Sequence, residues 1–119
     1  AWDNTVWESE KEPDFQWLEN ALKTNEEHYQ WQASGPYRHT ILLSHISLFD
    51  QQLSPYAEKL QELLTRYSIA FSVHGHGHDF SASHYNNGTP YVTVGSVQKR
   101  GYAELLITPD GVTVNKIEY

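Results

Sequence analysis

Three histidines alternate with glycines in the stretch VHGHGHDF, which spans Val73 to Phe80. Histidine is the commonest metal ligand in proteins, and glycine allows the backbone to approach a bound ion closely. If the stretch is extended, alternate side chains share one face and the three imidazoles point together. If Gly75 and Gly77 instead turn the backbone, neighbouring imidazoles are aimed at different ions. The alternative to a metal site is a leftover tag or a mobile polar loop, and the rest of the chain is needed to decide between them.

Two apolar segments lead directly into histidines. HTILLSH predicts a buried strand at Thr40–Ser44, which His45 follows, and a second buried strand is predicted at Ile69–Val73, which leads into His74. The chain between them predicts a helix, so the three elements form a βαβ unit with parallel strands. The carboxyl ends of both strands then lie at one edge of the sheet, where open α/β sheets bind ligands. We therefore expect His45 and the HGHGH segment to converge.

Two helices are expected, one of them inside the βαβ unit. In that helix Ser54 suits the cap and Pro55 the first helical position. Five of its residues form one apolar stripe: Tyr56, Leu60, Leu63, Leu64 and Tyr67. An earlier helix is expected over Asp14–Tyr29, with Pro13 in its first turn, and the segment Trp31–Arg38 with its Gly-Pro pair breaks it.

The C-terminal third of the chain has a different pattern. Strands joined by tight turns are predicted at Tyr91–Val94, Tyr102–Thr108 and Val112–Tyr119. The Pro-Asp-Gly sequence between the last two is typical of a hairpin. Apolar alternation shifts within the last strand, which predicts a bulge near Asn115.

Composition limits the class of protein. The chain has 119 residues, of which 39% are hydrophobic and 13% aromatic, as expected of one small folded domain. Its formal net charge of −7 argues against nucleic acid as a default partner. Without cysteine it has no disulfide or thiolate site, and no apolar run is long enough for a membrane span. No signal peptide is visible at Ala1, and the absence of methionine predicts a processed product or a piece of a longer chain.

The order of the histidine motifs resembles that of a known enzyme family. LLSH at Leu42–His45, followed about thirty residues later by GHGH at Gly75–His78, resembles the last two metal motifs of the calcineurin-like metallophosphoesterases. QWLENAL at Gln16–Leu22 and the ending YVTVGS…GYAELLITPDGVTV are similar to a helix and to the closing antiparallel strands of that family. The resemblance covers nearly the whole chain. It implies an α/β fold that is the C-terminal half of a two-sheet αββα sandwich. In this half, a βαβ unit precedes antiparallel strands. Residues 1–119 then form a single partial domain.

The resemblance also implies an activity and a set of ligands. The family hydrolyses phosphate esters at a dinuclear metal site, and Fe, Mn and Zn all suit histidine and oxygen ligands. By this resemblance His45 and His76 bind one metal of the pair and His78 binds the other. His74 precedes the motif glycine and is expected, at most, to support the ligands without touching the metal.

The family's first three motifs, Asp-x-His, Gly-Asp and Gly-Asn-His-Asp/Glu, are missing from this sequence. They supply the bridging aspartate, the remaining ligands and the histidine that protonates the leaving group. We therefore expect a truncated chain with no catalytic residue of its own, inactive in isolation. Without the other half, the apolar strands would be uncovered, so we also expect self-association or a retained N-terminal half.

Two other interpretations remain. In the first, the chain is a non-catalytic histidine-rich module that binds Zn, Ni or Cu. In the second, it is an interaction domain whose histidines have no role in metal binding. In every interpretation His28, His39 and His84 are expected to be solvent-exposed bystanders.

Overall fold

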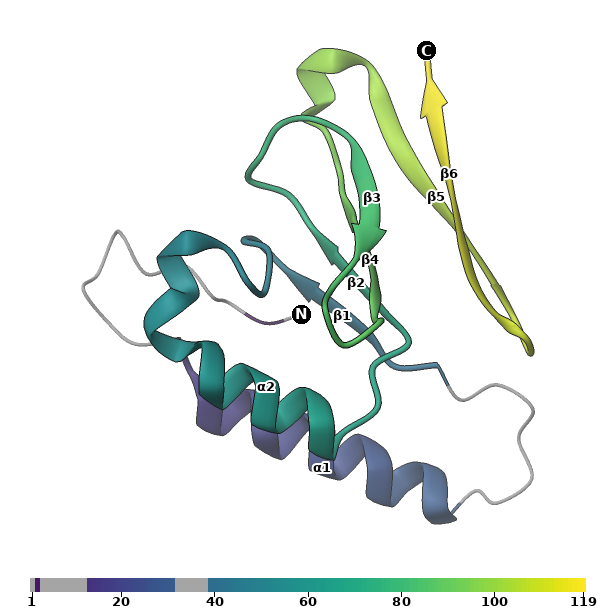
Figure 1. Cartoon of the computed structure of the whole chain (residues 1–119). Helices are drawn as coiled ribbons and strands as arrows, with labels where there is room; N and C mark the ends of the chain where they lie inside the picture. The colour runs from purple at the N-terminus through teal and green to yellow at the C-terminus, as the bar shows by residue number, and fades with distance from the viewer. Residues whose placement is uncertain (1, 3–12, 32–38) are drawn as a thin grey trace.

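The structure is a computed structural model that describes Trp2 and residues 13–31 and 39–119 (Figure 1). Most of the expected helix break, at Trp31–Arg38, lies outside the described residues. Its helices are α1 (Phe15–Trp31), the 3₁₀ helix η1 (Gln51–Tyr56), α2 (Ala57–Arg66) and the 3₁₀ helix η2 (Val97–Lys99). Its strands are β1 (Ile41–Ser44), β2 (Phe71–His74), β3 (Ser81–His84), β4 (Pro90–Thr93), β5 (Gly101–Thr108) and β6 (Gly111–Glu118). None of the described helices is long and apolar enough to cross a membrane.

Four strands form a mixed sheet in the order β1-β2-β4-β3. The pairs β1–β2 and β2–β4 are parallel, whereas β3 runs antiparallel to β4. The βαβ prediction is therefore confirmed, with α2 between two adjacent parallel strands. The expectation that the apolar strands are uncovered is wrong for the edges of β2, which is paired on both sides. On the outer edge of β1, the Trp2 N–H donates to the Leu43 carbonyl at 2.7 Å.

The two helices begin differently from what the sequence predicts. The Asp14 side chain accepts the Trp17 N–H at 2.8 Å, so Asp14 caps α1 and Pro13 precedes the helix. The prediction that Ser54 caps the second helix is wrong, because Pro55 lies inside η1 and α2 begins only after Tyr56. The apolar stripe of α2 is confirmed for four of its five residues, which are buried: Leu60, Leu63, Leu64 and Tyr67.

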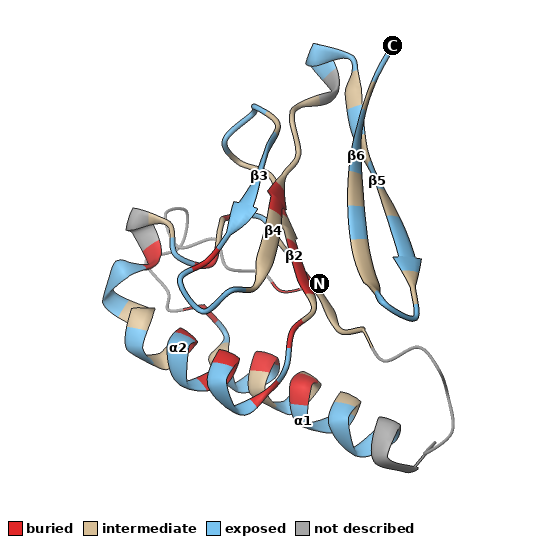
Figure 2. Ribbon diagram, turned by 45° about the vertical axis from the view of Figure 1, so that its right-hand side comes forward, coloured by how far each residue is buried: buried red, intermediate tan, exposed pale blue. Residues whose placement is uncertain are grey.

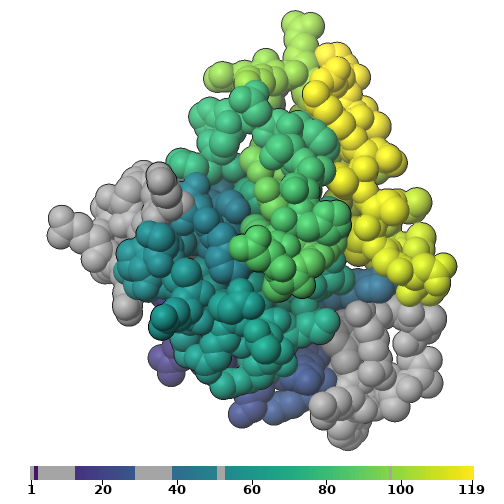
Figure 3. Space-filling view, in the orientation of Figure 1, coloured from purple at the N-terminus to yellow at the C-terminus, as the bar shows by residue number. Residues whose placement is uncertain are grey.

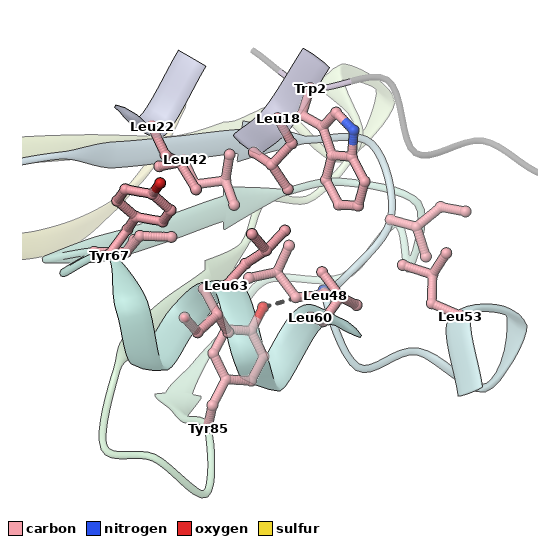
Figure 4. Close-up of a cluster of buried hydrophobic side chains, with 13 residues drawn as sticks. Trp2, Leu18, Leu22, Leu42, Leu48, Leu53, Leu60, Leu63, Tyr67 and Tyr85 are labelled. Carbon is pink, nitrogen blue, oxygen red and sulfur yellow. Dashed lines mark hydrogen bonds between the residues drawn. The ribbon is translucent and has the colours of Figure 1, made fainter. Parts of the chain in front are cut away.

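The main core lies between the helices and one face of the four-stranded sheet (Figures 2 and 4). Its members include Leu18 and Leu22 from α1, Leu42 from β1, the α2 stripe and Trp2. In Figures 1 and 2 the β5–β6 hairpin lies on the opposite side of the sheet from the helices. Helices, mixed sheet and hairpin thus form three successive layers, and the yellow atoms of β6 occupy one flank of the molecule in Figure 3.

The hairpin is regular, and the predicted bulge is absent. Eight residue pairs run without a break from Gly101–Glu118 to Thr108–Gly111, and Asn115 lies opposite Glu104. The alternation shifts because both faces carry apolar pairs, Leu105 with Val114 on one and Tyr102 with Ile117 on the other. The tight turn expected between the strands now seen as β4 and β5 is also wrong, since β4 belongs to the mixed sheet and η2 separates the two.

Candidate functional site

Parallel pairing of β1 with β2 brings the two histidine motifs to one edge of the sheet. The register aligns Ser44 with His74 at the ends of the two strands. The next residues continue the ladder, because the Gly75 N–H donates to the His45 carbonyl at 3.1 Å. The expected convergence of His45 with the HGHGH segment is therefore present in the backbone itself.

The HGHGH segment turns, and the turn is centred on histidine rather than on glycine. The Gly77 N–H donates to the Gly75 carbonyl at 2.7 Å, which closes a three-residue γ-turn around His76, where φ is 63°. His78 has a φ of 59°, whereas neither Gly75 nor Gly77 has a positive φ. The alternative in which the whole HGHGH segment is extended is therefore wrong, because the backbone turns after His74. Left-handed backbone at a non-glycine residue costs about 1–3 kcal/mol and is concentrated at functional sites.

The turn places the His76 ring beside His45. The two ring centroids lie 5.4 Å apart with an interplanar angle of 66°. His45 is exposed and His76 half-buried, so the pair is open to solvent. Metal–nitrogen bonds of about 2.0–2.1 Å place two imidazoles of one tetrahedral ion with their ring centres about 5 Å apart. The 5.4 Å between the two rings is close to this value, so their spacing is compatible with two ligands of a single ion.

His78 lies two residues further along and is exposed. Its carbonyl accepts the Ser96 N–H at 3.4 Å, which ties the end of the turn to the segment after β4. The next residue, Asp79, pairs with Lys99, whose hydrogen bond and positive charge hold the pKa of the Asp79 carboxyl below its usual value. Within the described ranges no three His, Asp or Glu side chains are grouped closely enough to hold a metal ion.

His74 is buried beneath the site and faces away from water. One ring nitrogen, Nε2, lies 2.7 Å from the Thr93 hydroxyl on β4, and its ring centroid is 5.4 Å from that of Tyr91. The other nitrogen, Nδ1, is buried without a hydrogen-bond partner among the described residues. Burial lowers the pKa of His74 to about 4, and the negative charge of Asp50 opposes this shift only in part. His74 is therefore a neutral residue that links β2 to β4.

Tyr85 is a residue of the site region that the sequence analysis did not single out. Its buried hydroxyl accepts the Leu48 N–H at 3.3 Å (Figure 4). The same hydroxyl lies 3.4 Å from the hydroxyls of Ser47 and Ser72. It thereby fastens the loop that follows His45 to β2. The Asn-Asn-Gly sequence that follows Tyr85 was the available signal, because it is typical of a tight turn that returns the chain to the sheet.

The three histidines expected to be bystanders differ from one another. His28 on α1 and His84 on β3 are exposed, as expected. The expectation is wrong for His39, which is half-buried and whose Nε2 donates to the Thr108 carbonyl at 2.7 Å. This bond ties the far end of the hairpin to the segment that precedes β1.

A scan against models of known protein families finds no match to this chain, and a search of curated proteins finds none either.

Proposed function

We propose that this chain is the C-terminal part of a calcineurin-like metallophosphoesterase domain, which hydrolyses phosphate esters at a dinuclear metal site. The observation that supports it best is the pairing of His45 with His76, 5.4 Å apart at the carboxyl ends of two adjacent parallel strands. The left-handed backbone at both His76 and His78 adds support, because the turn holds two expected ligands in strained conformations.

The layer order is compatible with half of a two-sheet αββα sandwich. Helices cover one face of the mixed sheet and the hairpin lies over the other (Figure 1). The outward face of the hairpin carries Tyr102 and Leu106, which are 50% and 54% exposed. In the proposed complete domain, further strands and a second helical layer would cover these side chains.

In the proposed enzyme, His45 and His76 would hold one ion and His78 the other, with Fe, Mn or Zn as the metals that suit such ligands. Bound ions would supply a hydroxide nucleophile and neutralise the charge of the phosphate ester. Within this chain, the γ-turn orients His76 toward His45, and Tyr85 holds the loop that follows His45. The remaining ligands and the acid for the leaving group would come from the family's first three motifs.

Titration of the 119-residue chain with zinc, measured by calorimetry, tests whether His45 and His76 bind the same ion. We expect His45→Ala and His76→Ala each to weaken zinc binding at least about tenfold, or about 1.4 kcal/mol, because each removes one of two nitrogens. His78→Ala should reduce binding of a second ion. His28→Ala and His84→Ala are the matched controls and should leave affinity unchanged. Wild-type affinity in both His45→Ala and His76→Ala would contradict the assignment.

The proposed phosphoesterase activity is tested first by reading the gene sequence upstream of the codon for residue 1. Coding sequence upstream of residue 1 with Asp-x-His and Gly-Asn-His motifs would support it, and the longer protein should hydrolyse p-nitrophenyl phosphate with added metal. The 119-residue chain should do so no faster than metal in buffer. Tight metal binding by a gene product without those motifs would favour the non-catalytic metal-binding module instead.

A further inference from the structure

The turn at Gly75–His78 keeps two candidate metal ligands in left-handed backbone. His76 and His78 have φ angles of 63° and 59°. Residues persist in such strained conformations only when the surrounding structure over-determines them. Within the turn the Gly77 N–H donates to the Gly75 carbonyl, but this short-range bond does not fix the turn relative to the sheet. The contacts that do so must come from neighbouring elements.

The end of β4 lies beside both ends of the turn. The parallel register places Thr93, the last residue of β4, opposite His74, the last residue of β2. The Val94 N–H donates to the His74 carbonyl at 2.8 Å. The Ser96 N–H donates to the His78 carbonyl at 3.4 Å. These backbone bonds fix the residue before the turn and the residue at its end.

The Thr93 side chain adds two contacts of its own. Its hydroxyl lies 2.7 Å from Nε2 of the buried His74 ring, whose Nδ1 has no hydrogen-bond partner within the described residues. Its methyl group lies close to Gly77, because a β-carbon at position 77 would come 3.4 Å from Thr93 Cγ2. One threonine thus contacts both the residue before the turn and the glycine between the two candidate ligands.

The hydroxyl is the contact on which the position of the turn depends most. Without it, the buried imidazole of His74 would have no hydrogen bond from the described residues, and an unsatisfied buried polar group is unfavourable. The ring would then be better placed in water, and the end of β2 would have to move with it. Gly75 and His76 follow directly, so the movement would change the distance between the His76 and His45 rings, now 5.4 Å.

We propose that Thr93 is a positioning residue for the metal ligands His76 and His78. Its hydroxyl fixes His74 at the start of the turn, and its methyl group supports Gly77 between the two ligands. Thr93 acts through the backbone of the turn and does not itself bind an ion. The inference rests on the proposed function for the role of the metal, whereas the contacts with the turn do not depend on a bound ion.

Two substitutions separate the hydroxyl from the rest of the side chain. Thr93→Val keeps the shape and removes the hydroxyl, and we expect it to weaken zinc binding about tenfold in calorimetry. In the metal-free chain it should change the backbone chemical shifts of His76 and His78, which report their φ angles. Thr93→Ser keeps the bond to His74, so its zinc affinity should stay within about threefold of the wild type.

Thr108→Val is the matched control for a general loss of stability. It removes a threonine hydroxyl that donates to the Gly111 carbonyl at 3.3 Å, at the turn of the β5–β6 hairpin. The control should lower the stability of the chain to urea, but it should change neither zinc affinity nor the shifts of the two histidines.

Three results would overturn the proposal: wild-type zinc affinity in Thr93→Val, equal losses in Thr93→Val and Thr93→Ser, or an equal loss in Thr108→Val. If the wild type bound no zinc, the proposed function would fail, and the metal-free spectra would decide the role of Thr93. Shifts of His76 and His78 that change in Thr93→Val alone would then support it, and unchanged shifts would overturn it.

Discussion

At the scale of single residues, the most informative feature is the left-handed backbone at two candidate ligands. Only three non-glycine residues in the described part of the chain have a positive φ: His76, His78 and Arg100. We expect His78→Gly to raise the free energy of unfolding of the metal-free chain by about 1 kcal/mol, since glycine adopts this conformation without steric cost. The same variant should lose metal affinity.

Arg100→Gly is the matched control for this prediction. The φ of Arg100 is 51°, so the glycine variant should also stabilise the metal-free chain. Zinc binding of this variant should be unchanged. Urea denaturation and zinc titration of both variants provide the two measurements. If His78→Gly retained wild-type zinc binding, the strain at that position would have no connection with a metal.

His74 gives the stability of the metal-free chain a dependence on pH. Its pKa is about 4 in the folded chain and about 6.5 when unfolded, so between these values the unfolded state takes up a proton that the folded state does not. Stability should therefore fall as the pH decreases from 6.5 to 4, by about 3 kcal/mol from this group alone.

Urea denaturation of the wild type, His74→Gln and His84→Gln at several pH values in EDTA would measure this contribution. Other groups also titrate between pH 4 and 6.5, so the quantity to compare is the slope of the free energy of unfolding against pH for each protein. His74→Gln should show a shallower fall in stability, and the exposed His84→Gln should follow the wild type. Equal slopes for all three proteins would show that His74 takes up its proton as readily in the folded chain.

At the scale of secondary-structure elements, Tyr85 connects the β3–β4 hairpin with the loop after β1. Tyr85→Phe removes a hydroxyl that accepts the Leu48 N–H and lies beside Ser47 and Ser72, and it leaves buried polar groups unsatisfied. We expect the variant to lose about 1–2 kcal/mol of stability. Its zinc affinity should also fall, because the loop fixes the position of His45, whereas Tyr119→Phe at the exposed end of the chain should change neither quantity.

The elements that could be predicted from the sequence are those with a clear apolar pattern or a characteristic turn sequence. The α2 stripe, the strands β1 and β2 and the β5–β6 hairpin follow from apolar patterns and the Pro-Asp-Gly turn. Strand β3 was missed because SASH has no apolar alternation, and all four of its residues are exposed. The bulge at Asn115 was wrong because Ile117 pairs with Tyr102 on the outward face, so the pattern has two apolar faces.

The candidate site shows the same division. Convergence of His45 with the HGHGH segment was predictable, since it needs only the topology of a βαβ unit. The Tyr85 contacts were not predictable, because they are hydrogen bonds between segments that are distant in the sequence. The turn of the HGHGH segment was one of two conformations that the sequence allowed, but its centre at His76 was not predicted. Left-handed histidines are also contrary to residue preference, which assigns such positions to glycine.

At the scale of the whole molecule, exposed apolar side chains predict association. Leu43 on β1 is 45% exposed, and Tyr102, Leu106 and Tyr119 on or beside the hairpin are 50%, 54% and 70% exposed. We expect sedimentation equilibrium at micromolar concentration to show dimers or larger species, because burial of such surface is favourable by roughly 25 cal/mol per Å². Leu106→Lys should shift the equilibrium toward monomer, with Glu104→Lys on the same face as the charge control. A cooperatively folded wild-type monomer would show that the chain needs no partner.

The parallel pairing of β1 with β2 also has a consequence for folding kinetics. His45 directly follows β1 and His76 lies two residues beyond β2. Because η1 and α2 lie between the two strands, the chain must close a long loop before their backbones meet. The β3–β4 and β5–β6 hairpins close over much shorter segments, and hairpins of this kind form within microseconds. We therefore expect the two imidazoles to come together late in folding, after the transition state has buried much of the core. Ions that bind to them would prolong the lifetime of the folded chain by slowing its unfolding, without speeding its folding.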